Sequence, residues 1–267
     1  MEQMEKEVSS EELSVAEESQ EKKKPERYSG ILVHPTSFPS PYGIGDLGKG
    51  AYDFIDFLAS SGQKIWQVLP LGPTGFGDSP YQTLSAFAGQ PYIISPDKLR
   101  EDGLLTDADL KDIPRSDPRQ VDYGEVIPYK MGLLHKAYDR FTAIHDQAME
   151  HAFSQYIEKE KYWLEDYALF MATKDYYQGR CWLDWEEGIR EGKEFSKVEY
   201  TWMLKEQIRF YEFLQFLFDR QWHQLRKYAT EKKILIIGDI PIFMSIDCAD
   251  VWADKSLFKL EIGRAHV

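Results

Sequence analysis

Three short apolar runs constrain the fold of this chain more than any other feature of its sequence. They are Gly30 to His34, Lys64 to Leu71 and Lys233 to Gly238, and each is closely followed by a proline. Runs of this length and composition, ended by turn-forming residues, are typical of buried strands. Between the first two, Asp46 to Ser60 carries apolar residues at helical spacing and predicts an amphipathic helix. A strand, a helix and a strand in this order predict a parallel sheet in an α/β fold.

The long stretch between the second and third runs predicts an insertion. From Gly72 to about Gln120 it is rich in Gly, Pro, Ser and Asp and has no sustained periodicity, which indicates a long ordered loop of the kind that often carries function. Helical periodicity follows over Tyr129 to Thr173 and over Met203 to Thr230, and we expect the aromatic second segment to pack in the core. Three strands leave much apolar helix surface uncovered, so we expect the front part of a larger α/β domain.

The charge of the chain limits its partners. Thirty-two Lys and Arg against 45 Asp and Glu give a net charge of -13, which repels phosphate backbones and anionic membranes. The first 24 residues hold eight Glu and four Lys without any aromatic residue, Gly or Pro, and residues 1–27 are predicted to be an acidic disordered tail. Neither a basic and apolar leader nor a run of about 18 apolar residues is present. We predict a cytoplasmic protein that binds neither nucleic acid nor membranes.

Two glycine-rich segments match nucleotide-binding motifs only in part. Gly43 to Gly48 has the letters of the dinucleotide fingerprint, but it does not follow its strand directly and the later acidic residue is missing. Gly72 to Gly77 has phosphate-loop spacing, but Asp78 replaces the lysine. The six histidines form neither HExxH nor a Cys-His cluster, and Cys181 and Cys248 are far apart. We therefore predict no cofactor and no metal.

Polar and aromatic residues gather where the predicted strands end. His34, the loop from Gly72 to Gln82, and Asp239 each follow a strand, and the carboxyl ends of parallel strands meet at one edge of a sheet, so we expect them to converge. The residues of this rim are Asp78, Ser79, Tyr81, Gln82 and Asp239, with Trp66 nearby. Aromatic faces beside carboxylates and neutral hydrogen-bonding groups suit sugars, although each residue by itself is equally consistent with a loop closure.

Four segments, in this order and spacing, resemble the 4-α-glucanotransferases of the amylomaltase, or disproportionating enzyme, type. They are ILVHPTSFPSPYGIGDLG, WQVLPLGPTGFGDSPYQTLSAFAGQPYIISP, WLEDYALFMATK and IIGDIPIFMSIDCADVWADKSLFKL. GDSPYQ followed by SAFAG is specific to that group. The resemblance implies the amino-terminal part of a (β/α)8 TIM barrel with inserted subdomains, incomplete in this chain. It also implies a transferase of carbohydrate metabolism that moves α-1,4-glucan segments between maltooligosaccharides by a retaining double displacement.

The resemblance assigns substrate-binding residues to this chain but no catalytic ones. Tyr81 matches an aromatic residue beside the reacting sugar, Asp239 matches a carboxylate of the same subsite, and Ser79 matches a nearby glucan contact. Phe76 stands where relatives often have Tyr in a second glucan-binding surface. The family's Asp nucleophile, Glu acid/base and third carboxylate lie on strands beyond the third, so we expect residues 1–267 alone to be inactive.

The resemblance also divides the chain. Residues 28–72 are expected to form the first β-α-β unit of the barrel, 73–232 an inserted loop and helical region, and 233–260 the third strand with its following loop. Residues 261–267 (EIGRAHV) depart from the acidic, Gly-containing continuation of the relatives and are expected to be a non-native tail.

Two other functions stay open at this stage. An α-glucan hydrolase of the same clan differs from a transferase only in its acceptor, which is water instead of a sugar. A non-catalytic glucan-binding module, complete in itself, is the second alternative, but it leaves strand edges and helix faces exposed.

Overall fold

A small parallel sheet forms from the three predicted runs. The computed structural model describes residues 27–113, 117 and 119–260, so most of the predicted tail and the predicted non-native residues 261–267 lie outside it. Strands β1 (Gly30–Leu32), β2 (Ile65–Gln67) and β3 (Leu235–Ile237) pair in parallel, in the order β1-β2-β3. The α/β class and the parallel strands are confirmed, each strand being shorter than its apolar run, while the complete barrel stays a prediction.

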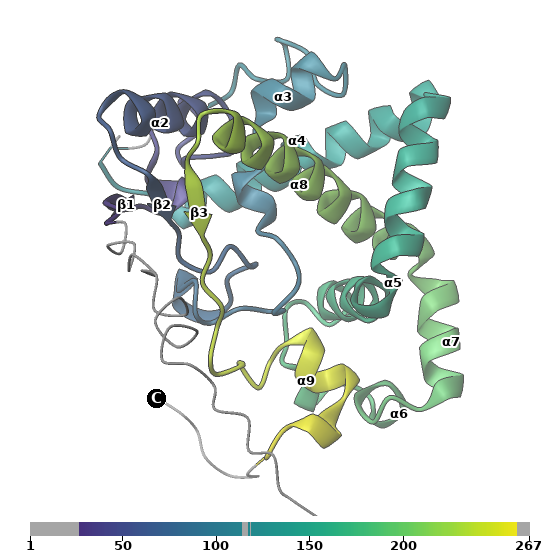
Figure 1. Cartoon of the computed structure of the whole chain (residues 1–267). Coiled ribbons are helices and arrows are strands. Elements are labelled where there is room, and N and C mark those ends of the chain that lie inside the picture. Colours follow the sequence, from purple (N-terminus) through teal and green to yellow (C-terminus); the bar gives the residue numbers. More distant parts are fainter. Residues whose placement is uncertain (1–26, 114–116, 118, 261–267) are drawn as a thin grey trace, which may run out of the picture.

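The two faces of this sheet differ. Helices α2 (Lys49–Ser60) and α8 (Lys205–Glu231) lie beside the sheet (Figure 1). Ile31, Trp66 and Ile236 share one row of the register, and their side chains pack in a core with these helices. The alternation of a strand sends their neighbours to the opposite face. There Leu32, Leu235 and Ile237 are 53%, 57% and 45% exposed. Within the described residues, one face therefore carries the helices and the other is open.

The region between β2 and β3 is mainly helical, as predicted, and a second core fills it. Its elements are η3 (Phe76–Asp78), η4 (Pro91–Ile93), α3 (Pro96–Glu101), α4 (Tyr123–Ile144), α5 (Gln147–Tyr176), η5 (Trp182–Asp184), α6 (Glu187–Arg190), α7 (Glu194–Met203) and α8. Three short helices lie outside it: η2 (Pro35–Ser37) after β1, and α9 (Ala249–Ala253) and η6 (Lys255–Leu257) after β3. Helix α5 packs against α8, where Phe153 and Phe213 are fully buried and meet edge to face. The aromatic segment of α8 is thus a core element.

The helical segment predicted over Tyr129 to Thr173 is two helices rather than one. His145 ends α4 in a left-handed conformation, with φ of 53°, and Asp146 begins α5. The Asp146 carboxylate accepts the backbone N–H groups of Ala148 and Met149, which otherwise have no partner in the first turn. Because this cap starts a new helix, the chain turns at residues 145–146.

A buried ion pair connects the insertion to the segment that follows β1. Lys130 of α4 is 1% exposed; its Nζ donates to the Ile94 carbonyl oxygen at 2.9 Å and lies 3.7 Å from Asp46 Oδ2. Burial lowers the pKa of Lys130 to about 8 and raises the pKa of Asp46. Asp46 also accepts the Gly48 N–H at 2.8 Å, so a carboxylate lies at the start of α2, where a dinucleotide fold binds pyrophosphate.

Candidate functional site

Tyr81 and Asp239 meet across the carboxyl ends of β2 and β3. The Tyr81 hydroxyl donates to Asp239 Oδ2 at 2.8 Å, although the two residues are 158 positions apart in the sequence. Each lies in the loop that follows its strand, so the predicted convergence of these two loops is confirmed. Their roles in sugar binding stay a prediction.

A tight backbone arrangement positions the loop that carries Tyr81. The segment from Pro73 to Gly75 runs beside Gln82 to Leu84: Leu84 N–H donates to the Pro73 carbonyl at 2.9 Å, and Gly75 N–H donates to the Gln82 carbonyl. At Gly72 the approach is so close that a Cβ atom would lie 2.4 Å from the Thr83 hydroxyl oxygen. Glycine is therefore required at that position by packing rather than by phosphate binding.

The hydrogen bond between Tyr81 and Asp239 also changes the pKa of the tyrosine. It raises the pKa of Tyr81, because the carboxylate stabilises the hydroxyl proton and its charge disfavours a phenolate. The ring of Tyr81 is 43% exposed and Asp239 is exposed as well. An accessible aromatic face beside a carboxylate is an arrangement that binds the apolar face and the hydroxyls of a sugar together.

Ser79 and Phe76 lie earlier in the same loop. The Ser79 hydroxyl oxygen accepts the Tyr81 backbone N–H at 3.4 Å, so Ser79 supports the turn that presents Tyr81. Phe76 begins η3, and its side chain is outside the described part of the structure. Beside η3 lies a hollow of about 530 Å³, lined by Asp78, Asp117 and residues 120–124.

Two residues expected near the rim serve the framework instead. Trp66 is fully buried, and its indole N–H donates to the Val33 carbonyl at 2.9 Å, so its ring is not available to a ligand. Trp66 was expected near the rim, but the alternation of β2 turns its side chain toward the helices instead. His34 contacts the Pro70 carbonyl at 3.2 Å and the Thr36 hydroxyl at 2.8 Å, and burial lowers the pKa of its ring. His34 therefore joins the loops after β1 and β2.

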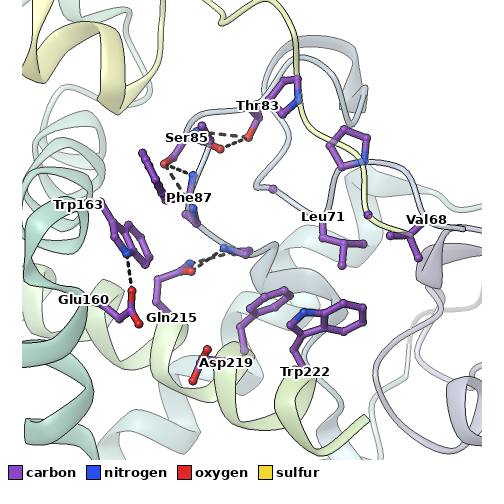
Figure 2. A pocket seen from close by; sticks show the side chains of 18 of the residues that line it. Val68, Leu71, Thr83, Ser85, Phe87, Glu160, Trp163, Gln215, Asp219 and Trp222 are labelled. Atoms are coloured by element: carbon purple, nitrogen blue, oxygen red, sulfur yellow. Dashed lines mark hydrogen bonds between the residues drawn. The ribbon is translucent and has the colours of Figure 1, made fainter. Parts of the chain in front are cut away.

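A cavity of about 370 Å³ lies between the loop after β2 and helices α5 and α8 (Figure 2). Asp239 lines it, but Tyr81 and Ser79 do not. Some of its polar groups are already paired: Gln215 accepts the Gly89 N–H at 2.7 Å and donates to the Gly89 carbonyl at 2.9 Å, and the Trp163 indole donates to Glu160. Sequence reasoning missed this cavity, because Gln215 and Gly89 are 126 positions apart and no local pattern relates them.

Two further features bear on the class of protein. Among the residues that the structure describes, no group of three His, Cys, Asp or Glu side chains is arranged to hold a metal ion. Over the same residues, no helix has the length and apolar character needed to cross a membrane.

The parallel sheet, with the loops after β2 and β3 joined by an exposed tyrosine and a carboxylate, places this chain among the α/β proteins. In that class, ligands commonly bind at the carboxyl ends of the strands. The sequence profile of the family described as 4-alpha-glucanotransferase matches residues 33–263. Since this match covers most of the sequence, the chain belongs to the 4-alpha-glucanotransferase family.

Individual relatives agree with this membership. The chain is 46% identical over 242 residues to a 4-alpha-glucanotransferase of Thermus thermophilus and 45% identical over 235 residues to that of a Synechocystis strain. These alignments cover 90% and 88% of this chain but 48% and 46% of the relatives, so the chain spans just under half their length. An amylomaltase from Streptococcus agalactiae, solved in complex with acarbose, is similar in structure: the TM-score is 0.84 and the identity 39%, over 89% of this chain and 48% of that one.

Proposed function

We propose that the protein containing this chain is a 4-alpha-glucanotransferase that moves α-1,4-glucan segments between maltooligosaccharides. The observation that carries the proposal is the Tyr81–Asp239 pair, formed at the strand ends of a chain that belongs to this family. The names of the relatives favour transfer to a sugar over hydrolysis. We also propose that this protein is located in the cytoplasm.

In the proposed reaction, this part of the protein binds and orients the sugar. A retaining double displacement needs a carboxylate nucleophile and a carboxylic acid/base on the two sides of one glycosidic bond. We assign Tyr81 to stacking on the reacting sugar, Asp239 to its hydroxyls and Ser79 to a nearby glucan contact. Phe76 of η3 is the proposed aromatic residue of a second glucan surface. None of these residues is assigned to nucleophilic attack or proton transfer.

Binding to residues 1–267 tests the site directly. We expect maltotriose to bind the chain in a nuclear magnetic resonance titration, and Tyr81→Ala to weaken that binding. Phe195→Ala is the matched control, because it removes another exposed aromatic ring, 80% exposed, from α7. Equal affinities of the wild type and Tyr81→Ala, or an equal loss in the control, contradict the site assignment.

The products formed by the whole native protein test the reaction. Transfer converts maltotriose into glucose and longer oligomers, whereas hydrolysis gives only shorter products. Chromatography of the products after incubation with maltotriose separates the two outcomes. Exclusive formation of shorter sugars contradicts the proposed transferase and supports the hydrolase.

A further inference from the structure

The segment that follows Asp239 has few contacts of its own. Three of its apolar side chains point into solvent: Ile240, Ile242 and Phe243 are 72%, 85% and 86% exposed, whereas Met244 packs against the second core. Burial therefore contributes little to the position of residues 240–243. Its placement depends on β3 at one end and on the residues around the start of α9 at the other.

The start of α9 is attached to the loop that carries Tyr81. Ala249 N–H donates to the Leu84 carbonyl at 2.9 Å, and Asp250 Oδ2 accepts the Ala86 N–H at 3.0 Å. Burial raises the pKa of Asp250, and the hydrogen bond from the Ala86 N–H opposes that shift. A half-buried carboxylate thus holds the loop through a hydrogen bond to its backbone.

Other contacts fix the same anchor on the side of the insertion. Asp247 forms an ion pair with Lys174 of α5 at 2.6 Å, and the Trp182 indole N–H donates to the Ile246 carbonyl. The two loops are consequently joined at two places. Tyr81 and Asp239 meet at one of them. At the other, an anchored point further along both loops, Ala249 bonds to Leu84 and Asp250 to Ala86.

We propose that Asp250 is a positioning residue of the carbohydrate site: its carboxylate holds the loop at Ala86 and thereby keeps Tyr81 against Asp239. The inference rests on the proposed function, because it concerns the same sugar. It predicts that the distance of the carboxylate from the Ala86 N–H, rather than its charge alone, determines how well sugar binds.

Two conservative substitutions separate this role from a purely local one. Asp250 lies in the first turn of α9, where any acidic residue is favourable to the helix. Asp250→Asn keeps an acceptor at the same place and loses the charge, whereas Asp250→Glu keeps the charge and displaces the acceptor by one methylene. If Asp250 positions the loop, Asp250→Asn preserves maltotriose binding and Asp250→Glu weakens it. If Asp250 serves only the helix through its charge, Asp250→Glu is the harmless change and Asp250→Asn is the damaging one.

The experiment measures maltotriose dissociation constants of the whole chain by nuclear magnetic resonance titration. We expect Asp250→Asn to stay within about twofold of wild type and Asp250→Glu to bind about tenfold more weakly, the size of one lost hydrogen bond. In a Tyr81→Ala background, Asp250→Glu should have no further effect, because the ring that it positions is absent. Asp254→Ala is the control, since Asp254 caps Ser256 within the same segment.

The outcomes distinguish failure of the inference from failure of the proposed function. If maltotriose does not bind, or if Tyr81→Ala leaves its affinity unchanged, the proposed site is wrong and the inference goes with it. If Tyr81→Ala weakens binding while Asp250→Glu does not, the site stands and the positioning role is overturned. An equal effect of Asp250→Glu with and without Tyr81 also overturns it, because a general structural role then accounts for the loss.

Discussion

Replacing Lys130 by Met should destabilise the fold by removing one half of a buried ion pair. Met has a similar length but no charge, so the Ile94 carbonyl loses its donor at 2.9 Å and Asp46 loses the cation 3.7 Å away. Asp46 is 6% exposed and keeps only the Gly48 N–H and a longer contact to the Ser40 hydroxyl. A buried charge left without its partner costs about 3–5 kcal/mol. For a chain of this size, that loss lowers the melting temperature by roughly 10 °C.

The pH dependence of this loss has a definite sign. Burial raises the pKa of Asp46 even in the wild type, where Lys130 opposes the shift. In Lys130→Met that opposition is gone, so the folded state binds the Asp46 proton more tightly than the unfolded chain does. The protonated carboxyl is tolerated near pH 4, and the destabilisation grows as the pH rises through the folded-state pKa of Asp46.

Urea unfolding of Lys130→Met, Asp46→Asn and the double variant measures how much free energy of unfolding each change removes. The double variant carries no buried charge, and an Asn oxygen still accepts the Gly48 N–H, so we expect stability within about 1 kcal/mol of wild type. A single variant that loses less than about 1 kcal/mol refutes the reasoning, and so does a double variant as unstable as the single one. A loss that is the same at pH 4 and pH 8 refutes the assignment of the cost to Asp46.

Three further predictions concern the sugar site. Tyr81→Phe should bind maltotriose with an affinity between those of wild type and Tyr81→Ala in a titration, because it keeps the stacking face, on the order of 1 kcal/mol, and loses the bond to Asp239. In the whole native protein, Asp239→Asn should lower turnover while its melting temperature stays near that of wild type, since an exposed carboxylate contributes little to the fold. Residues 1–267 alone should release no glucose from maltotriose above background, because the resemblance places the nucleophile and the acid/base on later strands; turnover by the purified chain, free of host enzyme, refutes this.

Features that depend on burial could be predicted from the sequence, because a buried face requires apolar residues at regular spacing along a strand or helix. The apolar runs identified the strands, and the spacing from Asp46 to Ser60 predicted α2 to within three residues of its start at Lys49. The same reasoning misplaced Trp66, since its position in a short run did not reveal which face of β2 it occupies. It also missed the break after α4, which depends on one left-handed residue, His145, and one capping side chain, Asp146.

Features that depend on hydrogen bonds between distant loops could be predicted only in part. Topology brought the ends of β2 and β3 together, so the convergence of Tyr81 and Asp239 followed from their places after parallel strands. The attachment of Asp250 to Ala86 links positions 164 residues apart through a backbone N–H, which any residue except proline supplies. No residue type marks such a contact, and the structure was needed to find it.

The geometry at Asp239 explains why the pairing with Tyr81 is compatible with ligand binding. Asp239 Oδ2 accepts the Tyr81 hydroxyl, and Oδ1 accepts the Ile240 backbone N–H at 2.8 Å, so both oxygens are oriented by the protein. A carboxylate has roughly four acceptor positions, which leaves about two for sugar hydroxyls. At the proposed site a sugar would therefore bind without breaking either bond, and the two side chains would already be ordered before binding. The Tyr81–Asp239 bond then belongs to the conformation that binds sugar, so its loss in Tyr81→Phe should appear as weaker binding rather than as a less stable fold.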